Sequence, residues 1–329
     1  MKILILDSPQ IRELLPMADC IELMSDALSA LARDEVYQPL RTIIRPPNAA
    51  GLLGLMSAYR GGEQGAFGLK AICVFPDNPS RGKDAHQGAV LLFSRETGEL
   101  LALMNASEIT AIRTAAVSAV ATRLLAREDA QELAIIGAGV QARTHLAALA
   151  CVRSIKRVRV AARNMESSQR LVSEMQPSVS FPIEAIQTNE QAVRGADLIV
   201  TATSSVEPVI KKDWISPGAH INGIGTHSPG SREIDSATMA AARIFVDRRE
   251  SALNESGDYL LAAKEGVIGP DNIIGEIGEL LIGKKSGRTS TTEITLFKSL
   301  GLAIEDVACA EYLYRKAQSQ GSGIWVDFL

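Results

Sequence analysis

The sequence predicts an α/β protein in which a doubly wound parallel sheet is accompanied by a second, α+β domain. Strand-like and helix-like segments alternate from residue 133 onward, a pattern typical of a parallel sheet covered by helices. A glycine-rich turn joins the first of these strands to a helix. The 329 residues also exceed the ~250–300 at which a single core stops growing, so two cores are expected.

The amino-terminal part of the chain has the pattern of the α+β domain. Residues 12–33 carry an apolar stripe at spacings of three and four, which predicts an amphipathic helix that opens near Pro16. Strand-like segments follow and offer a surface for this helix; they span residues 40–45, 51–59, 67–75, 89–93 and 100–104. A final amphipathic segment, 302–317, is expected to fold back here. The predicted domain therefore comprises residues 1–115 and is completed by residues 303–329.

A long helix is predicted after residue 107. Apolar residues recur at helical spacing from Ile109 to Leu124, and Ser107 with Glu108 offers a capped start. We expect this helix to bridge the two domains. Beyond it, strands are predicted at residues 133–136, 157–161, 198–202, 220–224 and 243–247. Residues 116–302 are therefore assigned to the parallel-sheet domain.

The turn after the first strand of this domain reads Gly137-Ala138-Gly139-Val140-Gln141-Ala142. Its spacing and its place between a strand and a helix are those of the Rossmann dinucleotide-binding fingerprint. Gly137 permits the tight turn, Gly139 lets the backbone approach a pyrophosphate, and Ala142 allows close packing of helix on strand. A plain glycine turn is the alternative. We predict that residues 137–141 hold the pyrophosphate of a nicotinamide dinucleotide at the helix N-terminus.

The end of the second strand bears on which dinucleotide is bound. An acidic residue there takes the ribose 2′-hydroxyl of NAD, whereas a basic one accommodates the 2′-phosphate of NADP. Here Arg163 and Asn164 follow the strand, and no acid stands beside them. NADP is therefore the predicted cofactor, with NAD possible, although Arg163 could also be a solvated surface residue. Thr114 and Thr203 complete the predicted cofactor site.

Composition excludes several classes of partner. The chain has 34 basic and 38 acidic residues and a net charge of −4, so it lacks the positive field that draws nucleic acid or anionic lipid. No apolar run approaches the ~20 residues of a membrane span, and a cytoplasmic location is expected. The four cysteines lack zinc or redox spacing and are predicted to be buried thiols, and the four histidines form no helical pair. No metal site is predicted.

Three basic residues stand among apolar neighbours in the first domain: Arg41, Lys70 and Arg113. Charges in such surroundings are rarely buried without an anionic partner. Each of them alone is equally consistent with a side chain whose head reaches solvent. The three residues lie in the segments P-L-R-T, F-G-L-K-A and A-I-R-T-A-A-V-S-A. The resemblance of these segments to a known family favours a shared role for the three.

Together with I-G-A-G-V-Q-A at 136–142, P-G-A-H-I-N at 217–222 and F-K-S-L-G-L-A-I-E-D at 297–306, these segments resemble the ornithine cyclodeaminase/mu-crystallin family over nearly the whole chain. The resemblance implies a two-domain subunit whose termini lie in a substrate and dimerisation domain, and hence a homodimer. It also implies that Arg41, Lys70 and Arg113 hold the carboxylate and imine region of a small substrate near the nicotinamide.

One loop distinguishes branches of that family. Ornithine cyclodeaminases carry an acidic residue in the loop after the fifth strand, where this sequence has His227. The loop looks more like those of the ketimine reductases and alanine dehydrogenase-like members, which disfavours cyclodeamination. His227 is predicted to contact substrate, or else is a loop residue with no chemical role.

The resemblance therefore implies NAD(P)H-dependent reduction of a small 2-imino acid (a ketimine) to an L-amino acid, or the reverse dehydrogenase reaction. Lys70 is predicted to hydrogen-bond near the reacting nitrogen or to supply a proton, and Asp306 is a second proton-relay candidate. The alternative for Asp306 is purely structural, because an acidic residue in the first turn of a helix is stabilised by the helix dipole alone. The alternatives are a cyclodeaminase-type lyase that recycles NAD and a mu-crystallin-like binding protein.

Overall fold

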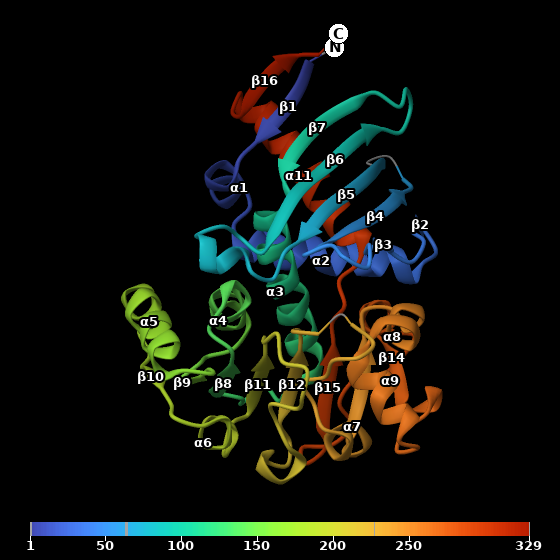
Figure 1. Ribbon diagram of the computed structural model, residues 1–329. Helices are drawn as coiled ribbons and strands as arrows, with labels where there is room; N and C mark the ends of the chain where they lie inside the picture. Colours follow the sequence, from blue (N-terminus) through green and yellow to red (C-terminus); the bar gives the residue numbers. More distant parts are fainter. Residues whose placement is uncertain (1, 63–64, 227, 329) are drawn as a thin grey trace. The chain divides into compact units, whose positions relative to one another are not determined.

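The computed structural model describes residues 2–62, 65–226 and 228–328. The chain forms two compact units, Met1–Arg113 with Gly301–Leu329 and Thr114–Leu300. Helix α3 (Ala106–Leu125) carries the boundary between them. Each unit contains an eight-stranded sheet, which confirms the predicted α/β class (Figure 1). None of the described helices combines the length and apolar character needed to cross a membrane.

The sheet of the second unit has the order β10-β9-β8-β11-β12-β15-β13-β14, and every pairing in it is parallel. The strands are β8 (Glu132–Ile136), β9 (Arg157–Ala161), β10 (Ile183–Ala185), β11 (Leu198–Thr201), β12 (His220–Gly223), β13 (Ala242–Val246), β14 (Ile273–Glu276) and β15 (Ile294–Lys298). The strand order reverses between β8 and β11, as in a doubly wound fold. This confirms the predicted parallel sheet.

Helices join these strands and cover the sheet: α4 (Val140–Val152), α5 (Met165–Met175), α6 (Asn189–Val193), α7 (Ser236–Ala241), α8 (Arg249–Glu255), α9 (Gly257–Lys264) and α10 (Ile277–Leu281). β11 and β15 are buried along their whole length, because helices lie on both faces of a parallel sheet. Prediction found five of these strands. It missed β10, β14 and β15, of which β15 lies between β12 and β13.

The sheet of the first unit is mainly antiparallel and has the order β16-β1-β7-β6-β5-β4-β2, with β3 paired to β4. Its strands are β1 (Lys2–Leu6), β2 (Val36–Tyr37), β3 (Thr42–Ile44), β4 (Leu52–Arg60), β5 (Ala66–Val74), β6 (His86–Ser94), β7 (Leu100–Asn105) and β16 (Ile324–Asp327). Helices α2 (Met17–Ala32) and α11 (Ala303–Gln320) pack on each other, and α11 also packs on β4, β5 and β6. The final helix thus returns to the first unit, as the sequence predicted.

The other face of this sheet, here called the outer sheet face, is apolar but uncovered by the described chain. Leu69, Leu91 and Leu103 are paired in register across β5, β6 and β7 and form one row on it. Phe67 and Leu103 are 48% and 37% exposed, and the Tyr59 and Phe67 rings lie 4.6 Å apart. Exposed apolar rows of this kind mark interaction surfaces.

The local predictions were borne out only in part. The amphipathic helix expected to open near Pro16 is α2, which begins at Met17 with Pro16 as its N-cap, whereas residues 12–14 belong to a separate helix, α1 (Ser8–Leu14). Ser107 does not cap α3: the Asn105 side chain accepts from the Glu108 N–H at 3.0 Å, and the Ser107 hydroxyl donates to the His86 carbonyl instead. Among the cysteines, Cys151 is exposed and Cys73 only half-buried, so the expectation of four buried thiols was too broad.

Candidate functional site

The glycine turn follows β8 at the carboxyl edge of the parallel sheet. Gly137 has φ of 115°, and a Cβ there would lie 2.4 Å from the Ala202 carbonyl oxygen, so only glycine fits. Gly139 is the N-cap of α4 and brings no side-chain acceptor, while a Cβ added to it would meet no atom within 4 Å. The space beside the first turn of α4 is therefore open. A dinucleotide pyrophosphate fits this cradle, because helix N-terminal N–H groups and the helix dipole attract anions.

Arg143, which sequence reasoning missed, holds this turn from within α4. Its guanidinium donates to the carbonyls of Ala138 at 2.7 Å and Gly139 at 3.0 Å, and Nε donates to Glu174 at 2.7 Å. In a trans peptide the N–H points opposite to the carbonyl, so the N–H groups of residues 139 and 140 point away from Arg143. Arg143 thus orients the donors of the cradle. The motif spacing gave no signal for it.

The end of β9 presents Arg163 and Asn164. Arg163 is exposed. Asn164 is the N-cap of α5, where its side-chain oxygen accepts from the Ser167 N–H at 2.9 Å. Both residues are exposed, but a structural role accounts for Asn164, so Arg163 is the stronger candidate of the two for contact with the cofactor.

The two predicted threonines have different surroundings. Thr114 is buried on α3, and its carbonyl accepts from Ser118, whose hydroxyl lies 2.9 Å from His145 Nε2. His145 Nδ1 lies 2.7 Å from the Gln141 carbonyl, so this chain of contacts connects α3 to the first turn of α4. Burial lowers the pKa of His145 to about 4, so the ring is neutral. Thr203 follows β11, and both its N–H and its hydroxyl donate to Glu233.

In the first unit, Lys70 and Asp306 form a buried ion pair. Lys70 lies in the middle of β5, is 3% exposed, and places Nζ 2.7 Å from Asp306 Oδ2 in the first turn of α11. Nζ also lies 3.4 Å from the Thr110 hydroxyl. Burial lowers the pKa of Lys70 to about 8; the Asp306 carboxylate opposes this shift, while Arg113 and Arg41 add to it. An amine of this kind can give up a proton near neutral pH.

Arg113 joins the same cluster from α3. Nε contacts Asp306 Oδ1 at 3.2 Å, and Nη1 contacts Glu305 Oε2 at 2.5 Å. The expectation of an anionic partner for a buried arginine is thus met by two carboxylates of α11. They outweigh the opposing effect of burial and raise the pKa of Arg113. Sequence reasoning missed Glu305, although it directly precedes Asp306.

Arg41 completes the predicted trio through a different contact. Its Nη2 donates to the Gly301 carbonyl at 2.9 Å, just before α11. His86 lies near the same group, since desolvation and the charges of Lys70 and Arg113 lower its pKa. His227, the remaining predicted substrate contact, lies outside the described residues.

We call Arg41, Lys70, Arg113, Glu305 and Asp306 the charged cluster. Three cations face two carboxylates, so the charged cluster carries one net positive charge when all five groups are ionised. A single carboxylate is the natural complement of that charge. A loop, a strand and two helices supply these side chains, and β5 with α11 fixes the central pair.

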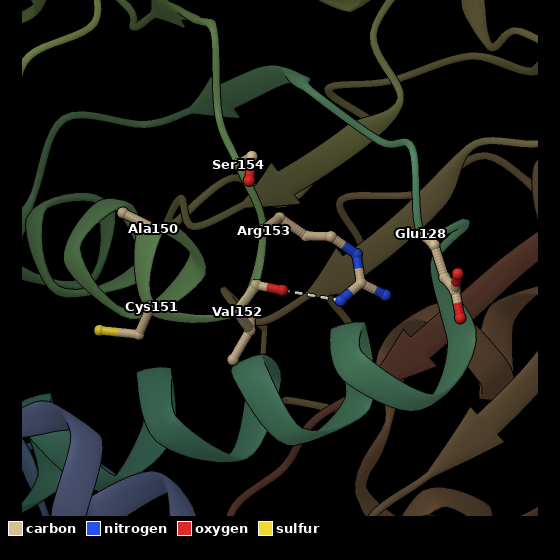
Figure 2. A pocket seen from close by; sticks show the side chains of 6 residues that line it. All are labelled: Glu128, Ala150, Cys151, Val152, Arg153 and Ser154. Carbon is tan, nitrogen blue, oxygen red and sulfur yellow. Dashed lines mark hydrogen bonds between the residues drawn. The ribbon is translucent and has the colours of Figure 1, made fainter.

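Two other polar groups lie at the amino edge of the parallel sheet and have structural explanations. In Figure 2, Arg153 lines a shallow pocket and donates to the Val152 carbonyl at 2.8 Å; it also donates to the Thr122 and Ala126 carbonyls at the end of α3. It therefore caps a helix.

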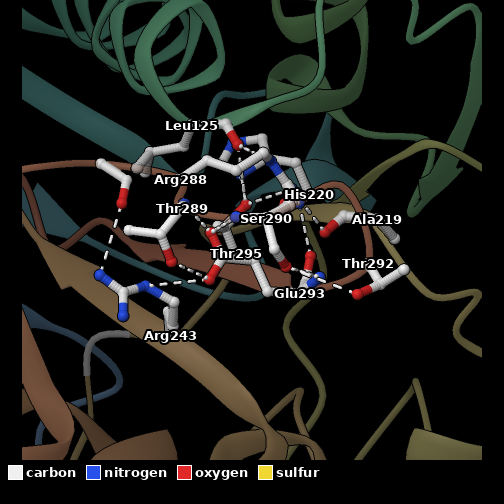
Figure 3. Close-up of polar contacts among 11 residues, drawn as sticks. Leu125, Ala219, His220, Arg243, Arg288, Thr289, Ser290, Thr292, Glu293 and Thr295 are labelled. Carbon is white, nitrogen blue, oxygen red and sulfur yellow. Dashed lines mark hydrogen bonds and ion pairs between the residues drawn. The ribbon is translucent and has the colours of Figure 1, made fainter.

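Figure 3 shows the second group, centred on Arg288. Its guanidinium donates to the Leu125 carbonyl at 2.7 Å and to the Thr295 hydroxyl at 2.9 Å. His220 lies 3.0 Å from the same hydroxyl, and burial, with help from Arg288, lowers its pKa to about 3. These contacts satisfy buried polar groups where β12 and β15 begin, away from the glycine turn.

Comparison with known proteins places these observations in one family. The profile of the ornithine cyclodeaminase/mu-crystallin family matches residues 1–321. The ketimine reductase mu-crystallin of Mus musculus is 40% identical over 279 residues, which is 85% of this chain and 85% of that protein. The structure of Thermococcus litoralis Delta(1)-pyrroline-2-carboxylate reductase in complex with NADH and L-proline has a TM-score of 0.95 at 38% identity, covering 98% of this chain and 99% of that one.

An archaeal alanine dehydrogenase dimer with bound NAD has a TM-score of 0.93 at 34% identity, over 100% of both chains. The matches extend over both units, so they cover the glycine turn as well as the charged cluster. The chain is a member of the ornithine cyclodeaminase/mu-crystallin family.

Proposed function

We propose that this protein is an NAD(P)H-dependent enzyme that reduces a small 2-imino acid to an L-amino acid, or catalyses the reverse reaction. The observation that carries the proposal is the buried Lys70–Asp306 pair beside Arg113, in a chain that also has an open glycine cradle. Family members with similar sequences are named as ketimine and pyrroline-2-carboxylate reductases, which supports this reaction class.

The chemistry assigns a task to each cation. The bound cofactor supplies a hydride to the α-carbon, and reduction is complete when the imine nitrogen has also received a proton. Lys70 is the proposed proton donor, since its pKa of about 8 lets it lose and regain a proton under physiological conditions. Asp306, 2.7 Å away, holds the ammonium in place.

The substrate carboxylate is assigned to Arg41 and Arg113. Guanidinium groups match carboxylates geometrically and stay charged, so they can orient the imino acid without taking part in proton transfer. Glu305 and Asp306 keep the Arg113 side chain in one orientation. A contribution of His227 remains part of the proposal.

A substrate panel tests the function. The purified protein is given preformed cyclic imines, or 2-oxo acids mixed with ammonia or methylamine. Oxidation of NADPH or NADH is measured as the loss of absorbance of the reduced cofactor. We expect cofactor oxidation with at least one imine and formation of the corresponding L-amino acid. Ammonia release from a diamino acid without net change in cofactor absorbance would identify a lyase instead. Binding without turnover of any imine would favour a binding protein.

The choice of cofactor is the first specific prediction. We expect higher kcat/KM with NADPH than with NADH, because the exposed Arg163 after β9 can pair bidentately with a 2′-phosphate. No acidic residue, which would bind the ribose 2′-hydroxyl of NADH, stands beside it. Arg163→Asp should reverse the preference. Steady-state kinetics with both cofactors measures this, with Arg170→Asp on α5 as the matched surface control. Equal kcat/KM values in the wild type would show that Arg163 does not read the 2′ position.

A homodimer is the second prediction. We propose that the outer sheet face of one chain covers that of another, which removes its apolar row from water. The wild-type protein should show a dimeric mass by light scattering at micromolar concentration. Leu103→Asp should shift the mass toward the monomer, whereas Val206→Asp, at a 65% exposed position in the second unit, should not. A monomeric wild type would contradict the proposal.

A further inference from the structure

A second cluster of buried charged residues, distinct from the charged cluster of the first unit, lies within the second unit. It consists of Glu233, Asp258 and Lys298, none of which is more than 1% exposed. Asp258 Oδ2 lies 2.9 Å from Lys298 Nζ, and Asp258 Oδ1 accepts from the backbone N–H groups of residues 233 and 234 at 2.7 and 3.0 Å. Asp258 therefore contacts both the Lys298 ammonium and the backbone N–H of Glu233. We call these three residues the buried triad.

Glu233 connects two loops at the carboxyl edge of the sheet. Its Oε1 accepts from the Thr203 N–H at 2.6 Å and from the Thr203 hydroxyl at 2.7 Å, just after β11. Its Oε2 accepts from the Gly225 N–H at 2.7 Å, just after β12, and from the Thr201 hydroxyl at 2.9 Å. One carboxylate therefore satisfies a backbone donor of each loop, and no amide of the same shape can do this, because its NH₂ group would face one of the two N–H groups.

The position of these loops suggests a role. A doubly wound sheet binds a dinucleotide across the point where the strand order reverses, with one nucleotide over each half. Here the reversal lies between β8 and β11. The adenosine half belongs to the side of β9, where Arg163 lies, so the nicotinamide half belongs to β11, β12 and β15. The loop after β11 also lies against the glycine turn, since a Cβ on Gly137 would lie 2.4 Å from the Ala202 carbonyl oxygen.

From this arrangement we infer that Glu233 is a positioning residue for the nicotinamide half of the cofactor. It holds the loops after β11 and β12 in the conformation that receives the ring, while Asp258 and Lys298 hold Glu233. The inference rests on the proposed function, because it presupposes a nicotinamide dinucleotide. It adds a requirement that the glycine turn does not impose: binding of the nicotinamide half depends on a carboxylate at position 233.

Calorimetric binding of two ligands separates this role from general stability. NADH contains the nicotinamide ring, and ADP-ribose contains only the remainder of the molecule. For Glu233→Gln we expect at least about a tenfold loss in NADH affinity, the usual consequence of breaking a hydrogen bond to a buried charge, with ADP-ribose affinity within about twofold of wild type. Glu293→Gln, at the opposite edge of the sheet, is the matched control and should change neither affinity.

The inference would be overturned if Glu233→Gln lowered the affinities for NADH and ADP-ribose by similar factors, or if it left NADH affinity unchanged. If Glu233→Gln does not fold, Thr201→Val removes one hydroxyl donor to Oε2 at constant shape and should lower NADH affinity alone, by a smaller factor. Equal effects of Thr201→Val on both ligands would likewise overturn it. A wild-type protein that binds ADP-ribose but neither NADH nor NADPH would instead defeat the proposed function, and the two failures are therefore distinguishable.

Discussion

A Lys70→Met variant is expected to lose about a hundredfold or more in kcat/KM on an imine substrate while binding NAD(P)H as the wild type does. A charged hydrogen bond that strengthens in the transition state contributes a few kcal/mol, which corresponds to roughly this factor. Lys70 belongs to the first unit and pairs with Asp306, whereas the glycine cradle is built from β8 and α4. Cofactor binding therefore serves as an internal reference for correct folding.

The pH dependence distinguishes a proton donor from a residue that only fills space. Because the pKa of Lys70 is about 8, the protonated form predominates below that value and is lost above it. The wild-type rate of imine reduction should therefore fall as pH rises through about 8, and this limb should be missing in Lys70→Met. Lys156→Met, at an exposed position, is the matched control and should keep both rate and limb. Wild-type turnover by Lys70→Met would refute the assignment.

The second large effect is expected from Gly139→Asp, which should abolish dinucleotide binding but preserve the fold. Position 139 has φ of −88°, which any residue adopts, and a Cβ there meets no atom within 4 Å. Aspartate is also a favourable N-cap, so α4 should not be destabilised. Its carboxylate would take the same first-turn N–H groups and repel the pyrophosphate.

Calorimetry with NADPH and NADH, together with thermal unfolding, measures both parts of this prediction. We expect no detectable binding at concentrations that saturate the wild type and an unfolding temperature close to that of the wild type. Gly139→Asn has a similar size and capping ability without the charge, and it should retain more affinity than Gly139→Asp. Near wild-type affinity in a folded Gly139→Asp protein would show that the dinucleotide does not bind at this turn.

Predictions from local patterns agreed with the structure where the residues of one short segment were sufficient to identify its structure. The turn from Gly137 to Ala142 is one such segment, because its glycine spacing between a strand and a helix lies in adjacent residues, although the atom that excludes a side chain at Gly137 is the carbonyl oxygen of Ala202. The missed strand β15 is the opposite case: Ile294–Lys298 follows β14 in the chain but pairs with β12 and β13, so its place in the sheet depends on residues distant in sequence. The helix start near Pro16 was predicted correctly, whereas the short helix α1 before it was not predicted.

The fold class, the dinucleotide fingerprint and the family could be predicted from the chain alone, because these depend on residues that are adjacent or regularly spaced along it. The sequence also singled out Lys70 and Arg113 as charges in apolar surroundings, but it could not name all their partners. The folded chain was needed to reveal that Glu305 and Asp306 neutralise Arg113, and that Glu233 joins the loops after β11 and β12. Such pairings connect residues far apart in sequence, and only the packing of helices and strands brings buried charges close enough to stabilise one another.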